Sequence, residues 1–392
     1  MLRYLLIFLL FCEFIQKENV YFTKNITSSN MIKLLQKLNV KLSGNIGLKI
    51  HSGEIGGKYF LHPNFLQEIY DYTNGTFIEC NTAYRAGRHS TEEHRKVLAA
   101  NGWLDNNRRT VIMDEDPNSD FNISISDPAQ ISENIVGAHL KDFYSSIVLA
   151  HFKGHGMGGF GGALKQLSIG FASQRGKTLI HSAGRSTDWT KGISGTSQKE
   201  FTNAMGDAAS SIVKYFRERG GIAFISVMAN ISKSCDCAGA RAPEPKIHDI
   251  GILASTDPVA LDRACLDLIK KYVDNGTEEL LNQIDRLEGE NTIFVAEKHG
   301  IGSQEYNFID IDDSDDSGDT DDSDNTNDSN DSDNSDGESN NSTFIIIICL
   351  IVLVVIVIAG IVVFMIFKRK SQQDQQTEET PNSGDDNKLM DE

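Results

Sequence analysis

The sequence predicts an α/β domain with a mainly parallel sheet and flanking helices, followed by one C-terminal transmembrane helix. The first observation is that short β-branched runs alternate with segments of helical periodicity between residues 18 and 309, which is typical of a parallel sheet covered by helices. The second is an uncharged run rich in Ile, Val and Leu over residues 344–367. Its length exceeds the roughly 20 residues that a helix needs to cross a bilayer core.

Within the α/β region the apolar runs and the helical patterns can be placed in chain order. The predicted strands are residues 46–50, 76–79, 110–113, 147–151, 222–227 and 250–254. The predicted helices are residues 31–38, 63–72, 91–101, 197–219, 258–272 and 277–287. Asp257 followed by Pro258 is a helix-start signal, because aspartate caps the first turn and proline suits its first position.

The two ends of the chain predict a membrane topology. Residues 1–17 contain Arg3 and then a short apolar run, the pattern of a signal peptide. Lys368, Arg369 and Lys370 directly follow the apolar segment, so the positive-inside rule places the C-terminus in the cytosol. We therefore expect a type I single-pass glycoprotein with a lumenal or extracellular domain. Acceptor sequons lie at Asn25, Asn74, Asn122, Asn230 and Asn275.

The acidic charge is concentrated outside the predicted domain. The formal net charge is −18, yet residues 310–342 carry fourteen Asp and Glu and no Lys or Arg. We expect residues 310–343 to form a disordered acidic stalk, and residues 368–392 a short disordered tail. Residues 18–309 keep a formal charge near −2. A nearly neutral domain does not predict a nucleic-acid partner.

Residues 151–165, HFKGHGMGGFGGALK, are the most unusual stretch of the domain. They follow a predicted buried strand and hold six glycines between positions 154 and 162. So many glycines predict positive φ angles or a close approach of the backbone to a ligand or metal. The candidate ligand-binding positions are Gly156, Gly158, Gly159, Gly161 and Gly162. The stretch formally matches a dinucleotide fingerprint, but no acidic residue ends a second strand at the required distance.

Polar and sulfur-containing residues follow several of the predicted strands. Because the carboxyl ends of parallel strands meet at one edge of a sheet, these side chains are expected to form a single site. They are His51, Glu54, Asn81, His151, His155, Cys235 and Cys237.

Two roles remain open for the cysteines of this group. His151, His155, Cys235 and Cys237 offer nitrogen and thiolate ligands for a transition metal ion of unknown identity. In an oxidising lumen the same thiols, with Cys80 and Cys265, could instead form disulfides. No cysteine spacing fits an iron–sulfur ferredoxin cluster.

Five segments carry a resemblance to a known family. They are KIHSGE at 49–54, CNTAYRAGR at 80–88, HFKGHGMGGFGGALKQLSIGFAS at 151–173, CDCAG at 235–239 and DIGILASTDPVALDRACLDL at 249–268. Together they resemble the family called domain of unknown function 362, whose prokaryotic members are described as uncharacterised iron–sulfur-centre proteins. Many members insert two four-cysteine clusters after the position of His181. This chain has no cysteine at 185–199, so it resembles the branch without clusters.

The resemblance implies a pocket but names no reaction. The positions that match its motifs include, beyond those above, Lys153, Lys165, His181 and Asp257. In one interpretation the domain is a metal-dependent enzyme in which His51 or Glu54 acts as general acid or base and Lys153 or Lys165 orients an anionic substrate. In the other it is a non-catalytic surface module that binds a ligand at the glycine loop. We expect a small-molecule ligand, with His181 at its binding site.

Overall fold

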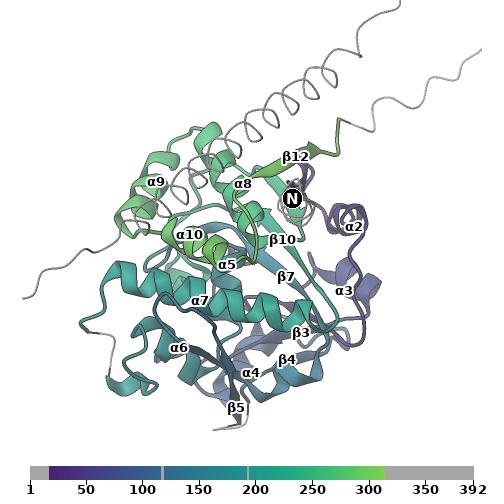
Figure 1. The fold of residues 1–392 in the computed structure, drawn as a ribbon. Helices are drawn as coiled ribbons and strands as arrows, with labels where there is room; N and C mark the ends of the chain where they lie inside the picture. The colour runs from purple at the N-terminus through teal and green to yellow at the C-terminus, as the bar shows by residue number, and fades with distance from the viewer. Residues whose placement is uncertain (1–16, 116–118, 192–193, 314–392) are drawn as a thin grey trace, which may run out of the picture. The chain divides into compact units, whose positions relative to one another are not determined.

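The computed structural model describes residues 17–115, 119–191 and 194–313. Its centre is an eight-stranded sheet (Figure 1) in the order β12-β1-β11-β10-β7-β2-β3-β4. Within this sheet β11 runs antiparallel to both of its neighbours, and the other neighbouring strands are parallel. The prediction of a mainly parallel α/β sheet is therefore confirmed. The strands are β1 (Glu18–Thr23), β2 (Ile46–Lys49), β3 (Thr76–Glu79), β4 (Thr110–Ile112), β7 (Ser145–His151), β10 (Ile222–Met228), β11 (Gly251–Ser255) and β12 (Tyr306–Asp310).

Two short hairpins and the helices complete the described part. β5 (Asp120–Ser124) pairs with β6 (Glu133–Gly137), and β8 (Lys153–His155) pairs with β9 (Gly159–Gly161). The helices are α2 (Ser28–Lys37), α3 (Gln67–Thr73), α4 (Thr91–Ala100), α5 (Ala163–Lys165), α6 (Gln174–His181), α7 (Gln198–Arg217), α8 (Pro258–Lys271), α9 (Thr277–Arg286) and α10 (Asn291–Lys298). Shorter 3₁₀ segments are η1 (Ala138–Asp142), η3 (Trp189–Lys191) and η4 (Asp236–Arg241), and η2 (Gln166–Gly170) is a π-helical turn.

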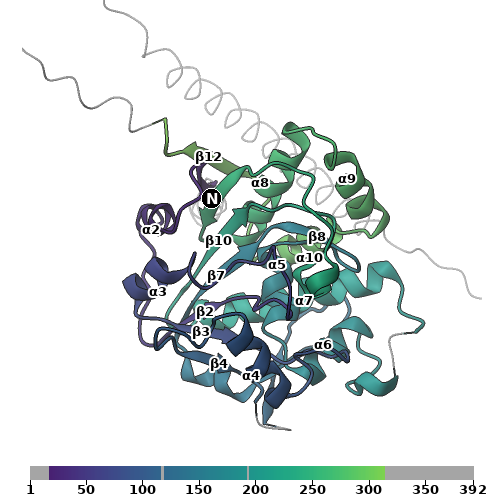
Figure 2. The same ribbon diagram turned by 180° about the vertical axis from the view of Figure 1, so that it is seen from behind.

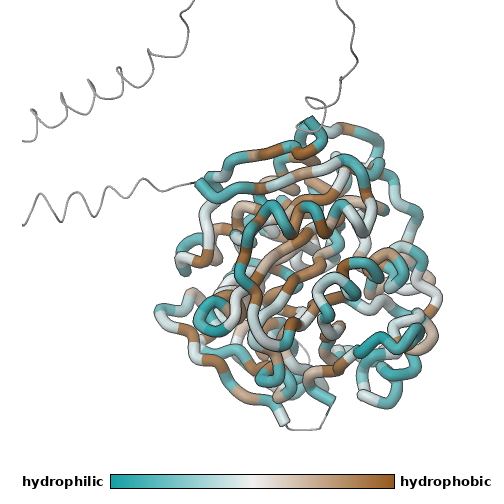
Figure 3. The backbone as a smooth tube through the Cα atoms, turned by 90° about the vertical axis from the view of Figure 1, so that its right-hand side faces the viewer, coloured by the Kyte–Doolittle hydropathy of each residue, from teal (hydrophilic) through white to brown (hydrophobic). Residues whose placement is uncertain are grey.

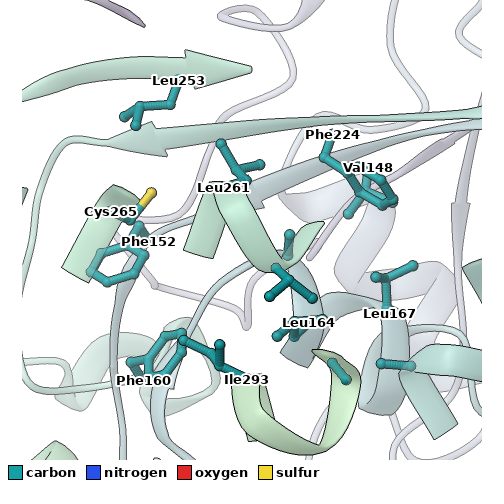
Figure 4. Packing of buried hydrophobic residues seen from close by; sticks show 14 of the residues in the cluster. Val148, Phe152, Phe160, Leu164, Leu167, Phe224, Leu253, Leu261, Cys265 and Ile293 are labelled. Carbon is teal, nitrogen blue, oxygen red and sulfur yellow. The ribbon is translucent and has the colours of Figure 1, made fainter. Parts of the chain in front are cut away.

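The sheet is buried on both faces. The central strands β7 and β10 are buried along their whole length, as expected for parallel strands between two helical layers. Val148 and Phe224 pack with residues of α7 and α8 (Figure 4), whereas their neighbours Leu149 and Ile225 pack with residues of α2, α3 and α4. Figures 1 and 2 show these two layers from opposite sides, and Figure 3 shows the hydrophobic stretches gathered inside the domain.

All six predicted strands and all six predicted helices are present. The strand ends lie within two residues of the prediction, but α3 begins at Gln67 and not at residue 63. Arg108 explains this late start, because its guanidinium donates to Asn64 Oδ1 and Gln67 Oε1 and holds residues 64–66 in a turn. Strand β1 and the edge strand β12 were not predicted. Each is half exposed, so neither shows a continuous apolar run.

The folded part continues into the range predicted as stalk. β12 ends at Asp310, and the Asp312 carboxylate accepts hydrogen bonds from Thr23 Oγ1 at 2.8 Å and Lys24 N at 2.9 Å. Within the described residues, no helix has the length and apolar character required to cross a membrane. The predicted signal segment up to residue 16, residues 314–343 of the stalk, the membrane segment 344–367 and the tail lie outside the described residues. The type I membrane topology therefore stays a prediction.

Candidate metal centre

The sheet order brings the predicted site residues to one edge. β3, β2, β7 and β10 are consecutive parallel neighbours, so their carboxyl ends lie side by side. His51 follows β2, His151 ends β7, and the β8 to β9 hairpin carries His155 back across this edge. The chain that leaves β10 returns to the same place, where Cys235 caps η4. The carboxyl ends of these strands therefore meet at one edge of the sheet.

Three of the predicted ligands form a compact group. The ligand atoms of His155, Cys235 and Cys237 all lie within 4.8 Å of one another. Cys235 is buried, while His155 and Cys237 are partly exposed. All four cysteines of the described residues are free thiols, so no disulfide removes either sulfur. One nitrogen and two sulfurs are a donor set that suits Zn²⁺ and other borderline-soft transition metals.

The pKa values of the two thiols in this group are shifted in opposite directions. The Cys237 thiol donates to Cys235 Sγ, and the nearby Lys165 ammonium and His155 add to this, so the pKa of Cys235 lies well below its usual value. The same hydrogen bond, together with burial, raises the pKa of Cys237. The Cys237 backbone N–H also donates to Cys235 Sγ at 3.3 Å. These shifts favour the thiolate at Cys235 and the protonated thiol at Cys237.

His155 is oriented by the turn that follows it. Its Nδ1 accepts from Gly158 N at 2.9 Å and Met157 N at 3.3 Å, and the ring also hydrogen-bonds Cys235. Burial and then the Lys165 charge lower the pKa of His155, so the ring is neutral near pH 7. In the neutral ring the proton sits on Nε2, because Nδ1 is an acceptor. A metal ion that binds here takes a neutral imidazole and thiolates, so its binding releases the proton of Cys237.

A cavity of about 290 Å³ opens beside the three ligands. Its polar lining includes Cys237, His51, Arg88, His155, Lys165, Lys177 and His181, and its apolar lining includes Met157, Ile169 and Trp189. His181 presents an acceptor to it: Nδ1–H donates to Lys177 O at 2.7 Å, and Nε2 has no hydrogen-bond partner among the described residues. Burial lowers the pKa of His181 to about 4, so this imidazole is neutral.

A buried ion network supports the cavity from the β2 and β3 side. Glu79 Oε1 pairs with Lys49 Nζ at 3.0 Å, and Glu79 Oε2 pairs with Arg88 Nη1 at 3.4 Å. Arg88 Nε also pairs with Glu54 Oε1 at 2.9 Å, and Tyr84 donates to the same oxygen. Although burial opposes ionisation, Lys49 and Arg88 hold the pKa of Glu79 well below its usual value. We call Lys49, Glu54, Glu79 and Arg88 the ion network.

Several predicted residues lie outside the compact group. His151 faces acceptors with both nitrogens, Asp236 at 3.1 Å and Ala229 O at 2.7 Å, so the structure does not bring it to the other ligands. Lys153 Nζ lies 2.6 Å from Asp236 Oδ2. His151 and Lys153 together hold the pKa of Asp236 well below its usual value, against the effect of burial.

Asn81 and two of the predicted glycines serve the protein's own packing, whereas a Cβ on Gly156 would meet nothing within 4 Å. Asn81 hydrogen-bonds the buried His94 and Asp114 and does not line the cavity. Gly159 has a φ of +77°, and a Cβ there would lie 2.9 Å from Gly289 Cα. A Cβ on Gly162 would lie 2.4 Å from Asp262 Oδ1. The predicted need for glycine is real at these two positions, and the close neighbour is the chain itself.

The sequence argument missed the residues that surround the predicted ones. Glu79 and Arg88 complete the ion network, Asp236 sits between the two cysteines, and Trp189 lines the cavity. A signal existed for Lys49 and Glu79, because each is a charged residue at the end of a predicted buried strand. Trp189 follows no strand and carries no such signal.

The fold and site define an α/β domain with a candidate metal centre at the carboxyl edge of its sheet. The chain belongs to the family described as Domain of unknown function (DUF362), whose sequence profile matches residues 46–267. No curated protein matches the sequence significantly.

Two solved structures are similar at a low level. One is a protein from Thermotoga maritima, with 16% identity and a TM-score of 0.34, covering 69% of this chain and 58% of that protein. The other is the lactate racemase apoprotein from Thermoanaerobacterium thermosaccharolyticum, with 12% identity and a TM-score of 0.34, covering 54% of this chain and 50% of that protein. This chain therefore spans 58% and 50% of the length of these two proteins.

Proposed function

We propose that the domain binds a transition metal ion through His155, Cys235 and Cys237 and acts with it on a small molecule in the adjacent cavity. The observation that carries this proposal is the compact group of three ligand atoms at the cavity wall. Three protein ligands leave a coordination position for water or substrate, which is typical of catalytic rather than structural zinc sites. A bound ion would polarise a substrate oxygen or lower the pKa of a bound water.

The acid–base role falls to the cavity histidines more readily than to Glu54. Glu54 does not line the cavity, and its Oε1 accepts from Arg88 and Tyr84, so this carboxylate positions the guanidinium. His181 Nε2 offers a free acceptor, and its neighbour Lys165 supplies positive charge. We assign proton acceptance to His181. His51 lines the same cavity and is a second candidate, with its pKa lowered by burial and then by Arg88.

We further propose that the domain is displayed outside the cytosol by the membrane segment at 344–367, with no nucleic-acid partner. The five sequon asparagines are all exposed, as glycan attachment requires. In an oxidising compartment two neighbouring free thiols are prone to oxidation, and a bound metal would protect both from it.

The test is elemental analysis of the purified full-length protein. We expect a near-stoichiometric transition metal in the wild type, loss of it in His155→Ala and in Cys235→Ser, and retention in His62→Ala, whose histidine is exposed and remote from the group. His151→Ala should keep the metal, since His151 is not in the group. Retention of metal by His155→Ala would refute the assignment. Stoichiometric metal with no turnover, in a protein that still binds ligands, would favour the non-catalytic surface module.

A further inference from the structure

We propose that the cavity takes a small organic carboxylate with an apolar body, and that Lys165 selects for its negative charge. The inference rests on the proposed function because it places this ligand beside the metal centre. It concerns the recognition of the ligand, which the metal ligands do not decide.

The sequence analysis gave Lys153 and Lys165 the same candidate role, and the structure shows that their charges are compensated differently. Lys153 Nζ is 2.6 Å from Asp236 Oδ2 and donates to His151 O at 3.1 Å, so its charge is compensated. Lys165 lines the cavity and has no carboxylate within ion-pair distance among the described residues. A partly buried cation without a carboxylate is costly unless a ligand provides one.

The other charges of the lining do not offset Lys165. Glu79 is already held by Lys49 and Arg88, and Arg88 in turn is neutralised by Glu54. Lys177 donates to Ala172 O at 2.6 Å, and its ammonium adds another positive charge to the cavity lining. Three cations therefore face the cavity against one carboxylate. A divalent metal ion would neutralise the two thiolates that bind it, and this leaves Lys165 without a negative neighbour.

The same cavity also offers an apolar surface. Met157, Ile169 and Trp189 line it, and the Trp189 indole is held in place by the His89 ring at 4.4 Å and the Arg85 guanidinium at 5.3 Å. An indole fixed in this way offers a surface against which a ring or branched chain packs. A few polar groups within a mainly apolar lining are the usual composition of a small-molecule site.

The test is calorimetric titration of the full-length, metal-loaded protein with 3-phenylpropionate. Three comparison ligands separate the parts of the proposal. The neutral 3-phenylpropanamide keeps the body without the charge, acetate keeps the charge without the body, and phenyl phosphate replaces the carboxylate by a phosphate ester. We expect 3-phenylpropionate to bind at least about tenfold more tightly than the amide, since a charge-assisted hydrogen bond contributes this much. It should also bind at least about tenfold more tightly than acetate, since acetate buries no apolar body, and more tightly than phenyl phosphate. Equal affinity for the amide, or tighter binding of phenyl phosphate, would overturn the proposal.

Matched variants assign the charge to Lys165. Lys165→Met should weaken 3-phenylpropionate binding about tenfold or more, Lys165→Arg should restore much of it, and the exposed Lys191→Met, beside Trp189, should leave it unchanged. An unchanged affinity in Lys165→Met contradicts the proposal. Metal content is measured in the same samples, so the two hypotheses fail separately. Stoichiometric metal without carboxylate binding overturns this inference alone, and carboxylate binding by a protein that holds no metal overturns the proposed function alone.

Discussion

Two groups of charged residues lie at the same edge of the sheet and differ in how their charges are compensated. In the ion network, Glu79 has a cation at each oxygen, and Arg88 bridges two carboxylates. In the second group, Lys165 has no carboxylate within ion-pair distance and His181 Nε2 has no hydrogen-bond partner among the described residues. The charges of the ion network are compensated within the folded chain. For the second group, we propose that a bound ligand compensates Lys165. Perturbed groups of both kinds occur here, so a shifted pKa alone does not identify the functional residues.

The comparison predicts the largest effect in the ion network. Glu79→Ala removes the carboxylate that holds Lys49, whose side chain is fully buried, and leaves this ammonium uncompensated. Breaking a buried ion pair in this way lowers the free energy of unfolding by about 3–5 kcal/mol. Chemical denaturation followed by fluorescence of the buried Trp103 would measure the loss.

A matched control is available on the surface. Glu92 pairs with Lys96 at 2.8 Å, and both side chains are exposed. Glu92→Ala should leave the free energy of unfolding nearly unchanged, because solvent screens an exposed ion pair. The double variant Lys49→Met/Glu79→Gln should recover part of the stability that Glu79→Ala loses, because it removes the unpaired cation and keeps an acceptor for Arg88. Equal losses in Glu79→Ala and Glu92→Ala would show that the ion network does not stabilise the fold.

The second prediction is that the protein loses stability at acidic pH because of His94, which hydrogen-bonds Asn81. His94 is completely buried between Ser52 and Asn81, and burial, followed by the Arg88 charge, lowers its pKa to about 3. In the unfolded chain a histidine titrates near 6.5. Between these values the unfolded state binds one more proton, so stability falls as the pH falls, by about 1.4 kcal/mol per pH unit.

His94→Gln removes this proton while keeping hydrogen-bonding groups near Ser52 and Asn81. The dependence of the free energy of unfolding on pH, measured between pH 4 and 6.5, should become shallower by the equivalent of about one proton. Other histidines, such as His181, keep their share of the slope. An unchanged slope in the variant would mean that His94 is already charged in the folded protein.

The sequence was sufficient to predict those features of the site that depend only on the direction of the strands. Apolar runs such as 147–151 and 222–227 identified the central strands, and the direction of parallel strands then brought His155 and Cys235 to one edge. The same reasoning could not separate His151 from His155. Both lie near the end of β7, and only the returning η4 segment, which places Asp236 against His151, decides which histidine remains available.

Pairing of charges was also beyond the sequence. Lys153 and Lys165 lie in the same glycine-rich stretch, and nothing in their spacing shows that one meets Asp236 and the other a cavity. Arg88 lies 34 residues from Glu54, its ion-pair partner, so only the folded chain shows that this carboxylate is occupied. Predictions from strand ends therefore locate a site, and the assignment of roles within it needs the contacts.

The smallest predicted effect compares the same substitution in the two groups. Lys49→Met leaves Glu79 with one cation fewer in a fully buried place, and should lower stability by several kcal/mol. Lys165→Met in the metal-loaded protein removes a cation that has no carboxylate, so the free energy of unfolding should stay constant or rise by up to about 1 kcal/mol. Denaturation of both variants beside the wild type measures the difference. If Lys165→Met lowered the free energy of unfolding as much as Lys49→Met, the distinction between the two groups would be lost. Such a result would show that Lys165 stabilises the fold and is not available to a ligand.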